Sequence, residues 1–277
     1  MASSNVDTIK QEDLEKISVR IARTKEEVLE AQRLRYAVFY EENGAIPDDN
    51  MRAEKRDFDD FDDIADHLIV IHKQDNGQER IVGTYRLLRQ AEAEKFGRFY
   101  SADEYDLKAL IDSNESLLEL GRSCVLAEYR TQPVLNMLWH GIADYITDHD
   151  IDILFGCASF SGTDVDSLKE QLSYLYHFHS APENISPVAT RERYINMNIV
   201  PKENIDEKKA FSSLPPLIKG YLRLGATIGN GAVIDKQFNT VDVCIVVQTK
   251  LMTQRYRKYY ERRIRKTMPG QRAIIEG

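Results

Sequence analysis

Residues 117–130 read LLELGRSCVLAEYR, an apolar run that predicts a buried strand but carries the charged residues Glu119 and Arg122. Long charged side chains are rarely buried unless they are paired. Regular alternation would place these two on opposite faces of the strand, whereas a bulge at Gly121 would bring them to one face of a cleft. There Arg122 could hold a carboxylate or orient Glu119, and Glu119 could take a proton from an amine, directly or through water. Both are therefore candidate catalytic residues, and the competing interpretation is a buried ion pair that only fixes the strand register.

The segments around this strand predict a mixed α/β sheet in one domain. A capping-box pattern at Thr24 and Glu27, followed by apolar residues at helical spacing, indicates a helix over 24–42. The turn signal DNG at 75–77 indicates two antiparallel strands within 65–90. Further strands are expected at 18–22, 152–160 and 240–249, and further helices at 133–149, 164–179 and 214–225. We expect a polar lead-in over 1–17, the domain over 18–249 and a basic tail over 250–277.

The composition indicates a chain that buries a substantial core, since 42% of its 277 residues are hydrophobic. No apolar run approaches the ~20 residues of a membrane-spanning helix, and the first residues lack the apolar stretch of a secretory signal. We therefore expect a cytoplasmic protein. The three cysteines match no metal-binding spacing, and their odd number argues against a disulfide framework. No metal site is expected.

Charge is distributed unevenly along the chain. The net charge is −8, yet the segment KLMTQRYRKYYERRIRK at 250–266 carries eight basic residues and one Glu, so the remainder carries −15. Such a basic, tyrosine-rich segment suits an anionic membrane surface, an acidic protein or nucleic acid, and a solvated helix is the plain alternative. The candidate partner-binding residues are Arg255, Arg257, Lys258, Arg262 and Arg263.

Other polar residues occupy predicted elements or loops. Arg35 and Phe39 are neighbours on the predicted first helix, and Arg86 interrupts a strand pattern. Six aspartates lie within RDFDDFDDIAD at 56–66, a density typical of a solvated loop, a cation site or a contact with basic groups. This loop lacks the glycine turn and terminal Glu of an EF-hand. Ser161 and Thr163 follow the carboxyl end of a strand, where ligands often bind in α/β sheets.

Taken in order, the motifs RYAVFYEE, DDFD, GTYRLL and ELGRSCV resemble the signature of acyl-homoserine-lactone synthases. That family belongs to the GNAT-like acyltransferases that take acyl groups from acyl carrier protein. The later stretches CASFSGTD, LSYLYHFHSAP and LPPLIKGYLRLGATIGNGAVIDKQFNTVDVCIV more specifically resemble bacterial ornithine N-acyltransferases, which make lyso-ornithine lipid. The resemblance implies a mostly antiparallel GNAT-like sheet flanked by helices, with a bulged and splayed central strand. The substrate-binding residues that it implies are Arg35, Phe39, Asp59, Asp62, Arg86, Ser161 and Thr163.

The implied reaction moves a (3-hydroxy)acyl group from acyl carrier protein to the α-amine of L-ornithine. Glu119 is then the base or water-positioning residue, and backbone N–H groups near the splay stabilise the carbonyl oxygen. Asp59 and Asp62 either receive the substrate's ammonium groups or fix the arginines. The basic tail meets acyl carrier protein or the anionic inner face of the membrane, and nucleic acid is not expected. No cofactor is expected to be bound, because the phosphopantetheine is carried by the donor.

Two departures refine the resemblance. The lactone synthases usually have a tryptophan where this chain has Ala45, which weakens a lactone product. The segment YRTQPVLN at 129–136 lacks the glycine loop that cradles pyrophosphate in acetyl-CoA enzymes, which a carrier-protein donor would permit. The alternatives are a signal synthase that uses S-adenosylmethionine, acylation of another amino acid such as glutamine, and a non-enzymatic lipid-binding module.

Overall fold

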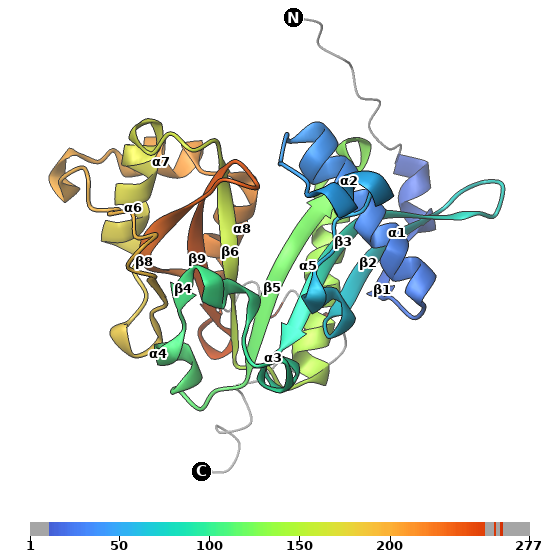
Figure 1. The fold of residues 1–277 in the computed structure, drawn as a ribbon, viewed down its shortest axis with the longest axis horizontal. Coiled ribbons are helices and arrows are strands. Elements are labelled where there is room, and N and C mark those ends of the chain that lie inside the picture. The colour runs from blue at the N-terminus through green and yellow to red at the C-terminus, as the bar shows by residue number, and fades with distance from the viewer. Residues whose placement is uncertain (1–10, 253–257, 259–260, 263–277) are drawn as a thin grey trace, which may run out of the picture. The chain divides into compact units, whose positions relative to one another are not determined.

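The computed structural model describes residues 11–252 together with 258, 261 and 262 (Figure 1). These residues form two compact units. The first contains the described residues up to Leu88 and then Leu120–Tyr145, and the second contains Arg89–Glu119 and the described residues from Ile146 on. Strand β5 (Leu117–Val125) and helix α5 (Gln132–Asp148) therefore each contribute residues to both units.

The first unit has the strand order β1-β2-β3-β5. Strand β2 pairs antiparallel with both β1 and β3, with a register shift between Val70 and Ile71. The hairpin predicted around DNG is thus confirmed. Its elements besides β5 and α5 are β1 (Ile17–Ile21), α1 (Lys25–Tyr36), α2 (Asp49–Glu54), β2 (Asp66–Lys73) and β3 (Glu79–Arg89), with 3-10 helices at Gln11–Lys16, Asp60–Asp63 and Ala127–Tyr129.

Helix α1 begins where the sequence predicts, because the Thr24 side chain accepts a hydrogen bond from the backbone N–H of Glu27. Its apolar face is buried in one core cluster of the first unit, which contains Ala31, Leu34, Val38, Ile69, Ile71, Ile81 and Cys124. The helix does not stop at Tyr36 but continues as a π-helical turn over Ala37–Glu42. Such turns are rare and occur often at functional sites.

The second unit has the strand order β5-β6-β9-β8-β7-β4. Strands β6 and β9 pair antiparallel along their whole length, and β8 pairs antiparallel with β9 across an irregularity between Ile228 and Ala232. Helix α6 lies against β8 (Figure 1). The elements besides β5 and α5 are α3 (Gln90–Phe96), β4 (Tyr105–Asp106), α4 (Lys108–Ile111), β6 (Ile153–Ser161), α6 (Lys169–His179), β7 (Val188–Ala189), α7 (Glu207–Ser213), α8 (Pro216–Leu224), β8 (Thr227–Asp235) and β9 (Thr240–Gln248).

These pairings confirm a mixed α/β fold with a mostly antiparallel sheet. The parallel pairs are β5 with β6 and β7 with β8. The pairing of β5 with β6 extends only over Leu117–Glu119, and three residues later Arg122 has the left-handed φ of 54°. The irregular central strand is therefore present, with its left-handed residue at Arg122, next to Gly121. The bulge expected at Gly121 itself stays a prediction.

Several elements were not predicted, among them the two-residue strands β4 and β7 and the nine-residue strand β8. Within the described part of the chain, no helix combines the length and apolarity needed to cross a bilayer. In the basic segment, Lys258 and Arg262 are exposed, whereas Arg255, Arg257 and Arg263 lie outside the described residues.

Candidate functional site

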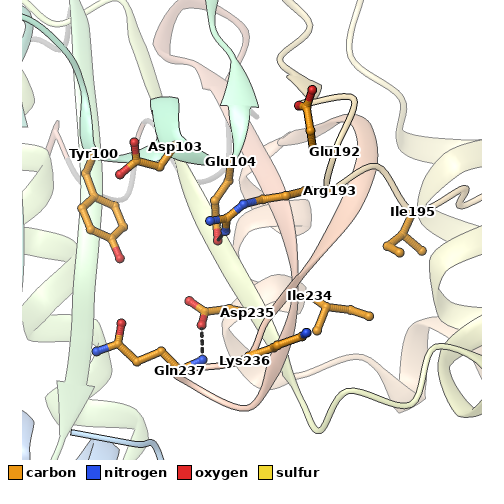
Figure 2. Close-up of a pocket in the computed structure, with 10 residues that line it drawn as sticks. All are labelled: Tyr100, Asp103, Glu104, Glu192, Arg193, Ile195, Ile234, Asp235, Lys236 and Gln237. Carbon is orange, nitrogen blue, oxygen red and sulfur yellow. Dashed lines mark hydrogen bonds and ion pairs between the residues drawn. The ribbon is translucent and has the colours of Figure 1, made fainter. Parts of the chain in front are cut away.

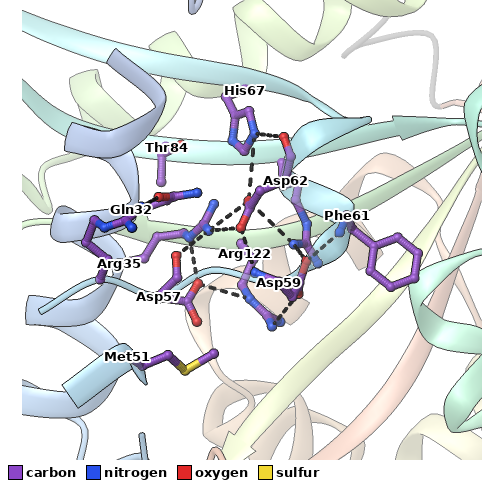
Figure 3. A network of polar contacts seen from close by, with 12 residues as sticks. Gln32, Arg35, Met51, Asp57, Asp59, Phe61, Asp62, His67, Thr84 and Arg122 are labelled. Atoms are coloured by element: carbon purple, nitrogen blue, oxygen red, sulfur yellow. Dashed lines mark hydrogen bonds and ion pairs between the residues drawn. The ribbon is translucent and has the colours of Figure 1, made fainter. Parts of the chain in front are cut away.

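The first unit holds a buried network of arginines and aspartates (Figure 3). At its centre is Arg35, whose side chain is 0% exposed. Its Nε donates to Asp57 Oδ2 at 2.7 Å, and its Nη2 donates to the Asp57 carbonyl at 2.7 Å and to Asp62 Oδ1 at 2.8 Å. Helix α1 supplies the arginine, and the aspartate-rich loop supplies both carboxylates.

Two arginines from neighbouring strands complete this network. Arg86 on β3 donates to Asp59 Oδ1 at 2.5 Å, and Arg122 on β5 donates to Asp57 Oδ2 at 3.2 Å and to Asp59 Oδ2 at 3.1 Å. The left-handed backbone at Arg122, which costs roughly 1 kcal/mol for a residue with a side chain, accompanies these contacts. The aspartates therefore bridge α1, β3 and β5 within the first unit.

Asp59 and Asp62 also build their own loop. The Asp59 side chain accepts from Phe61 N and the Asp62 side chain accepts from Asp59 N, which is the reciprocal arrangement of a capping box around the short helix Asp60–Asp63. This local structure turns both carboxylates toward the arginines. Of the three bridging aspartates, Asp59 is the most exposed, with 22% of its side chain accessible.

Asp57 and Asp62 are held in their charged form. Burial alone would raise the pKa of Asp57, but Arg122 and Arg35 outweigh burial and lower it. The same opposition of burial against Arg35 and Arg86 lowers the pKa of Asp62 to about 2. Ion pairing therefore outweighs desolvation at Asp57 and Asp62. The contacts of Asp59 and Asp62 match the alternative, open from the sequence, in which these carboxylates fix the arginines.

Asp57 is the functional candidate that the sequence reasoning missed. It is fully buried and also accepts a hydrogen bond from the Tyr40 hydroxyl at 2.9 Å, from the π-helical turn. Only the density of aspartates in RDFDDFDD pointed toward it. Phe39, from the same turn, is half-buried and packs against the apolar cluster of the first unit.

Glu119 lies in the second unit, where the residue is 3% exposed. Its Oε2 accepts from Tyr100 N at 2.8 Å and its Oε1 accepts from Ser101 N at 2.7 Å. These N–H groups open the 3-10 helix Tyr100–Asp103. The carboxylate thus fixes this helix start. Because Glu119 and Arg122 belong to different units, their shared cleft stays a prediction.

The same 3-10 helix borders a cavity of about 560 Å³ in the second unit (Figure 2). Tyr100 lines it from this helix, Ile234 from the end of β8 and Gln237 from the β8–β9 turn. Its charged lining residues are Asp103, Glu104, Glu192, Arg193, Asp235 and Lys236. Sequence reasoning named none of these, because each lies in a short polar segment without a recognisable motif.

Glu104 is the most buried charged residue of this cavity, at 6% exposure. Its Oε2 accepts from Cys157 Sγ at 3.4 Å, and its Oε1 lies 3.2 Å from Arg193 Nη1. Burial, with Asp242 beside it, raises the pKa of Glu104 to about 7. Potential metal ligands on Glu104, Cys157 and Asp242 lie within 4.8 Å of one another, but burial also raises the pKa of Cys157, which keeps its thiol protonated and a poor ligand.

Ser161 and Thr163 are exposed at the far end of β6. The register partner of Glu119 on β6 is Phe155, six residues before Ser161, which corresponds to about 20 Å along a strand. The structure therefore does not bring Ser161 and Glu119 together.

This chain is similar to known acyltransferases. Residues 34–140 match the acetyltransferase (GNAT) domain family. The L-ornithine N(alpha)-acyltransferase of Rhodobacter capsulatus is 44% identical over 248 residues, covering 89% of this chain and 95% of that protein. The enzyme of the same name from Brucella abortus is 46% identical over 262 residues, covering 93% of each chain. The solved structure of FeeM, an N-acyl amino acid synthase from uncultured soil microbes, aligns with a TM-score of 0.47 at 13% identity, covering 84% of this chain and 90% of that one.

The mixed sheet, the domain match and the acyltransferase relatives define the class of protein: this is a GNAT-type N-acyltransferase. Identity at this level over nine-tenths of the chain narrows the assignment further. The chain belongs to the family of L-ornithine N(alpha)-acyltransferases.

Proposed function

We propose that this enzyme transfers a (3-hydroxy)acyl group from acyl carrier protein to the α-amine of L-ornithine and so produces lyso-ornithine lipid. The observation that carries this proposal is the 44% and 46% identity to enzymes named L-ornithine N(alpha)-acyltransferase over about nine-tenths of the chain. The donor follows from the chemistry that the family resemblance implies. Its phosphopantetheine arrives with the carrier protein, so no bound cofactor is part of the proposal.

The reaction forms the amide C–N bond, breaks the thioester C–S bond and releases the thiol of the carrier. A thioester is already activated, so the enzyme must mainly position the amine and remove its proton. We assign the proton acceptor to Glu119, acting directly or through water. Its fixed position against Tyr100 N and Ser101 N supports this role, because a general base must be held within reach of the proton it takes.

The arginine–aspartate network serves this reaction as scaffold. Arg35 is 0% exposed and forms ion pairs with Asp57 and Asp62, so we assign it to positioning and not to substrate contact. Arg122 and Asp59 lie at the more accessible side of the network, at 10% and 22% side-chain exposure. Any direct substrate contact from the network would therefore come from these two.

The decisive experiment incubates the purified full-length chain with 3-hydroxyacyl carrier protein and, separately, L-ornithine, L-lysine and L-glutamine. Mass spectrometry should detect N-acyl-ornithine, with ornithine preferred. A parallel reaction with S-adenosylmethionine tests the signal-synthase alternative, whose product would be a lactone. Absence of N-acyl-ornithine, or a lactone instead, contradicts the proposal.

The role of Glu119 is tested with Glu119→Gln. General-base catalysis contributes roughly 10²- to 10⁴-fold, so kcat should fall by about that factor while the chain still folds. Glu203→Gln is the matched control, since Glu203 is an exposed residue of the same unit. A non-enzymatic lipid-binding module would instead retain its biological activity in Glu119→Gln.

The basic segment is proposed to bind acyl carrier protein or an anionic membrane. A truncation after Met252 tests this role and retains the ion pair of Lys250 with Glu115. It should weaken association with carrier protein or with vesicles containing anionic lipid. Unchanged binding to both would overturn the assignment.

A further inference from the structure

We propose that the cavity beside the 3-10 helix Tyr100–Asp103 is the seat of the acceptor amino acid, with the acceptor's side-chain ammonium at Glu104 and its α-carboxylate at Lys236. This inference rests on the proposed function and adds to it a location and a basis for substrate choice. The cavity volume of about 560 Å³ lies within the range of small-molecule binding sites.

The charges around the cavity match a dibasic amino acid. Four carboxylates and two cations line it, so its interior favours a ligand with one negative and two positive groups. In Figure 2, Tyr100, Glu104 and Arg193 lie on one side of the cavity and the segment Asp235 to Gln237 lies across from them. A ligand between these walls would meet both signs of charge at once.

The deepest charge of the cavity is Glu104. The side chain of Glu104 is 8% exposed, and Asp242 and Cys157 lie close to its carboxylate. The cation beside it comes from Arg193, whose side chain is 47% exposed. A buried carboxylate with another acid at its back gains from a second cation, because the ligand's ammonium would offset the mutual repulsion. Burial first, and then repulsion from Asp242, raise the pKa of Glu104.

Lys236 supplies the opposite charge at the mouth of the cavity. It is exposed and makes no hydrogen bond or ion pair with another described residue. Asp235 beside it accepts the backbone N–H groups of Gln237 and Phe238, which fixes the turn that carries the lysine. The ammonium of Lys236 is thus available to a carboxylate from outside the chain.

The proposed base and this cavity share one structural element. Glu119 binds the N–H groups of Tyr100 and Ser101, and Tyr100 lines the cavity. An amino acid seated here would therefore lie beside the helix that Glu119 anchors, and this anchoring fixes one wall of its site.

This arrangement predicts which acceptors are chosen. Glutamine has the same α-carboxylate but no side-chain ammonium, so it would lose the contact with Glu104. Lysine keeps the charge but adds one methylene, a difference that is worth roughly tenfold or more in a fitted site. Ornithine should bind best, and the preference over glutamine should depend on Glu104.

The test measures L-ornithine binding by isothermal titration calorimetry without any acyl donor, and the KM for ornithine and for glutamine in turnover. Glu104→Gln should raise the ornithine Kd and KM at least about tenfold while changing glutamine little, which reflects the loss of a charged hydrogen bond. Lys236→Gln should raise the KM of both amino acids. The controls are Glu203→Gln and Lys208→Gln, both at exposed positions of the same unit.

The outcomes separate this inference from the proposed function. If ornithine is acylated but neither variant changes its KM or Kd, the seat is wrong and the function stands. If ornithine binds with the predicted dependence on Glu104 and Lys236 but is never acylated, the seat stands and the function is wrong. Should Glu104→Gln fail to fold, the exposed Lys236→Gln still decides, because unchanged KM and Kd values in that variant would overturn the seat.

Discussion

Replacing Arg35 by methionine tests whether the arginine–aspartate network holds the first unit together. The variant removes a fully buried cation with hydrogen bonds to Asp57 and Asp62, and leaves both carboxylates in place. Removing one partner of a buried ion pair usually costs about 3–5 kcal/mol. Because Asp57 keeps Arg122 at 3.2 Å and Asp62 keeps Arg86 at 3.5 Å, we expect the lower end, about 3 kcal/mol at pH 7.

The pH dependence gives this prediction a sign. The pKa of Asp62 is lowered from 3.8 to about 2 in the folded chain, so its contribution is present above pH 3.8 and is lost as pH falls toward 2. That shift corresponds to about 2 kcal/mol. Without Arg35, part of this contribution is already missing. The difference in free energy of unfolding between wild type and Arg35→Met should therefore narrow as pH falls from 5 to 3.

Urea unfolding followed by the fluorescence of Trp139, the only tryptophan of the chain and a residue of the first unit, measures this difference. Arg33→Met is the matched control, since Arg33 is exposed on the same helix two residues away. We expect it to change stability by less than about 0.5 kcal/mol. A loss in Arg35→Met no larger than in Arg33→Met would refute the reasoning.

Three further predictions concern other buried positions. Burial raises the pKa of Glu104 from the usual 4.5 to about 7, so the folded chain loses stability as pH rises from 4.5 through 7. Measured by urea unfolding, the free energy of unfolding of Glu104→Gln should therefore rise by about 2–3 kcal/mol relative to wild type between pH 5 and pH 8. A difference that does not change with pH would contradict this prediction. Gly229→Ala should lower the free energy of unfolding by about 1–3 kcal/mol, since its added Cβ would lie 2.7 Å from the Pro187 carbonyl oxygen. An unchanged urea midpoint would show that the backbone at Pro187 can move away without loss of stability. Tyr40→Phe removes the hydrogen bond to Asp57 and should lower the free energy of unfolding by about 1 kcal/mol, measured by urea unfolding with Trp139 fluorescence. An unchanged free energy of unfolding would mean that this hydrogen bond makes no net contribution to stability.

Elements with strong periodicity and clear end signals could be predicted from the sequence. Helix α1 has its cap at Thr24 and an apolar face, and the strands β6 and β9 are long apolar runs, so local pattern and tertiary structure agree. Strand β8 was not predicted because it contains Gly229 and Gly231 and an irregularity in its pairing, which hide the alternation of a strand. The two-residue strands β4 and β7 carry too little pattern to predict at all.

The site was predicted in part for a similar reason. Arg35, Asp59, Asp62, Arg86 and Arg122 are charged residues within recognisable motifs, and the structure brings all five into one network. The partners within that network depend on tertiary packing, which no spacing rule encodes. The cavity residues Glu104 and Lys236 lie far apart in polar segments, so only the folded sheet brings them together.

The first unit is built from two separate segments of the chain, which affects how the chain folds during synthesis. Its acidic loop is made early, but Arg122 follows Asp57 by 65 residues and Asp59 by 63, on the far side of a segment that belongs to the other unit. Until the ribosome has released the segment Leu120–Tyr145, the carboxylates of the nascent loop lack Arg122, one of the cations that will neutralise them. Contacts of such long sequence separation form slowly. A chain stalled before Leu120 should therefore expose an unfinished, acidic N-terminal half to chaperones and proteases.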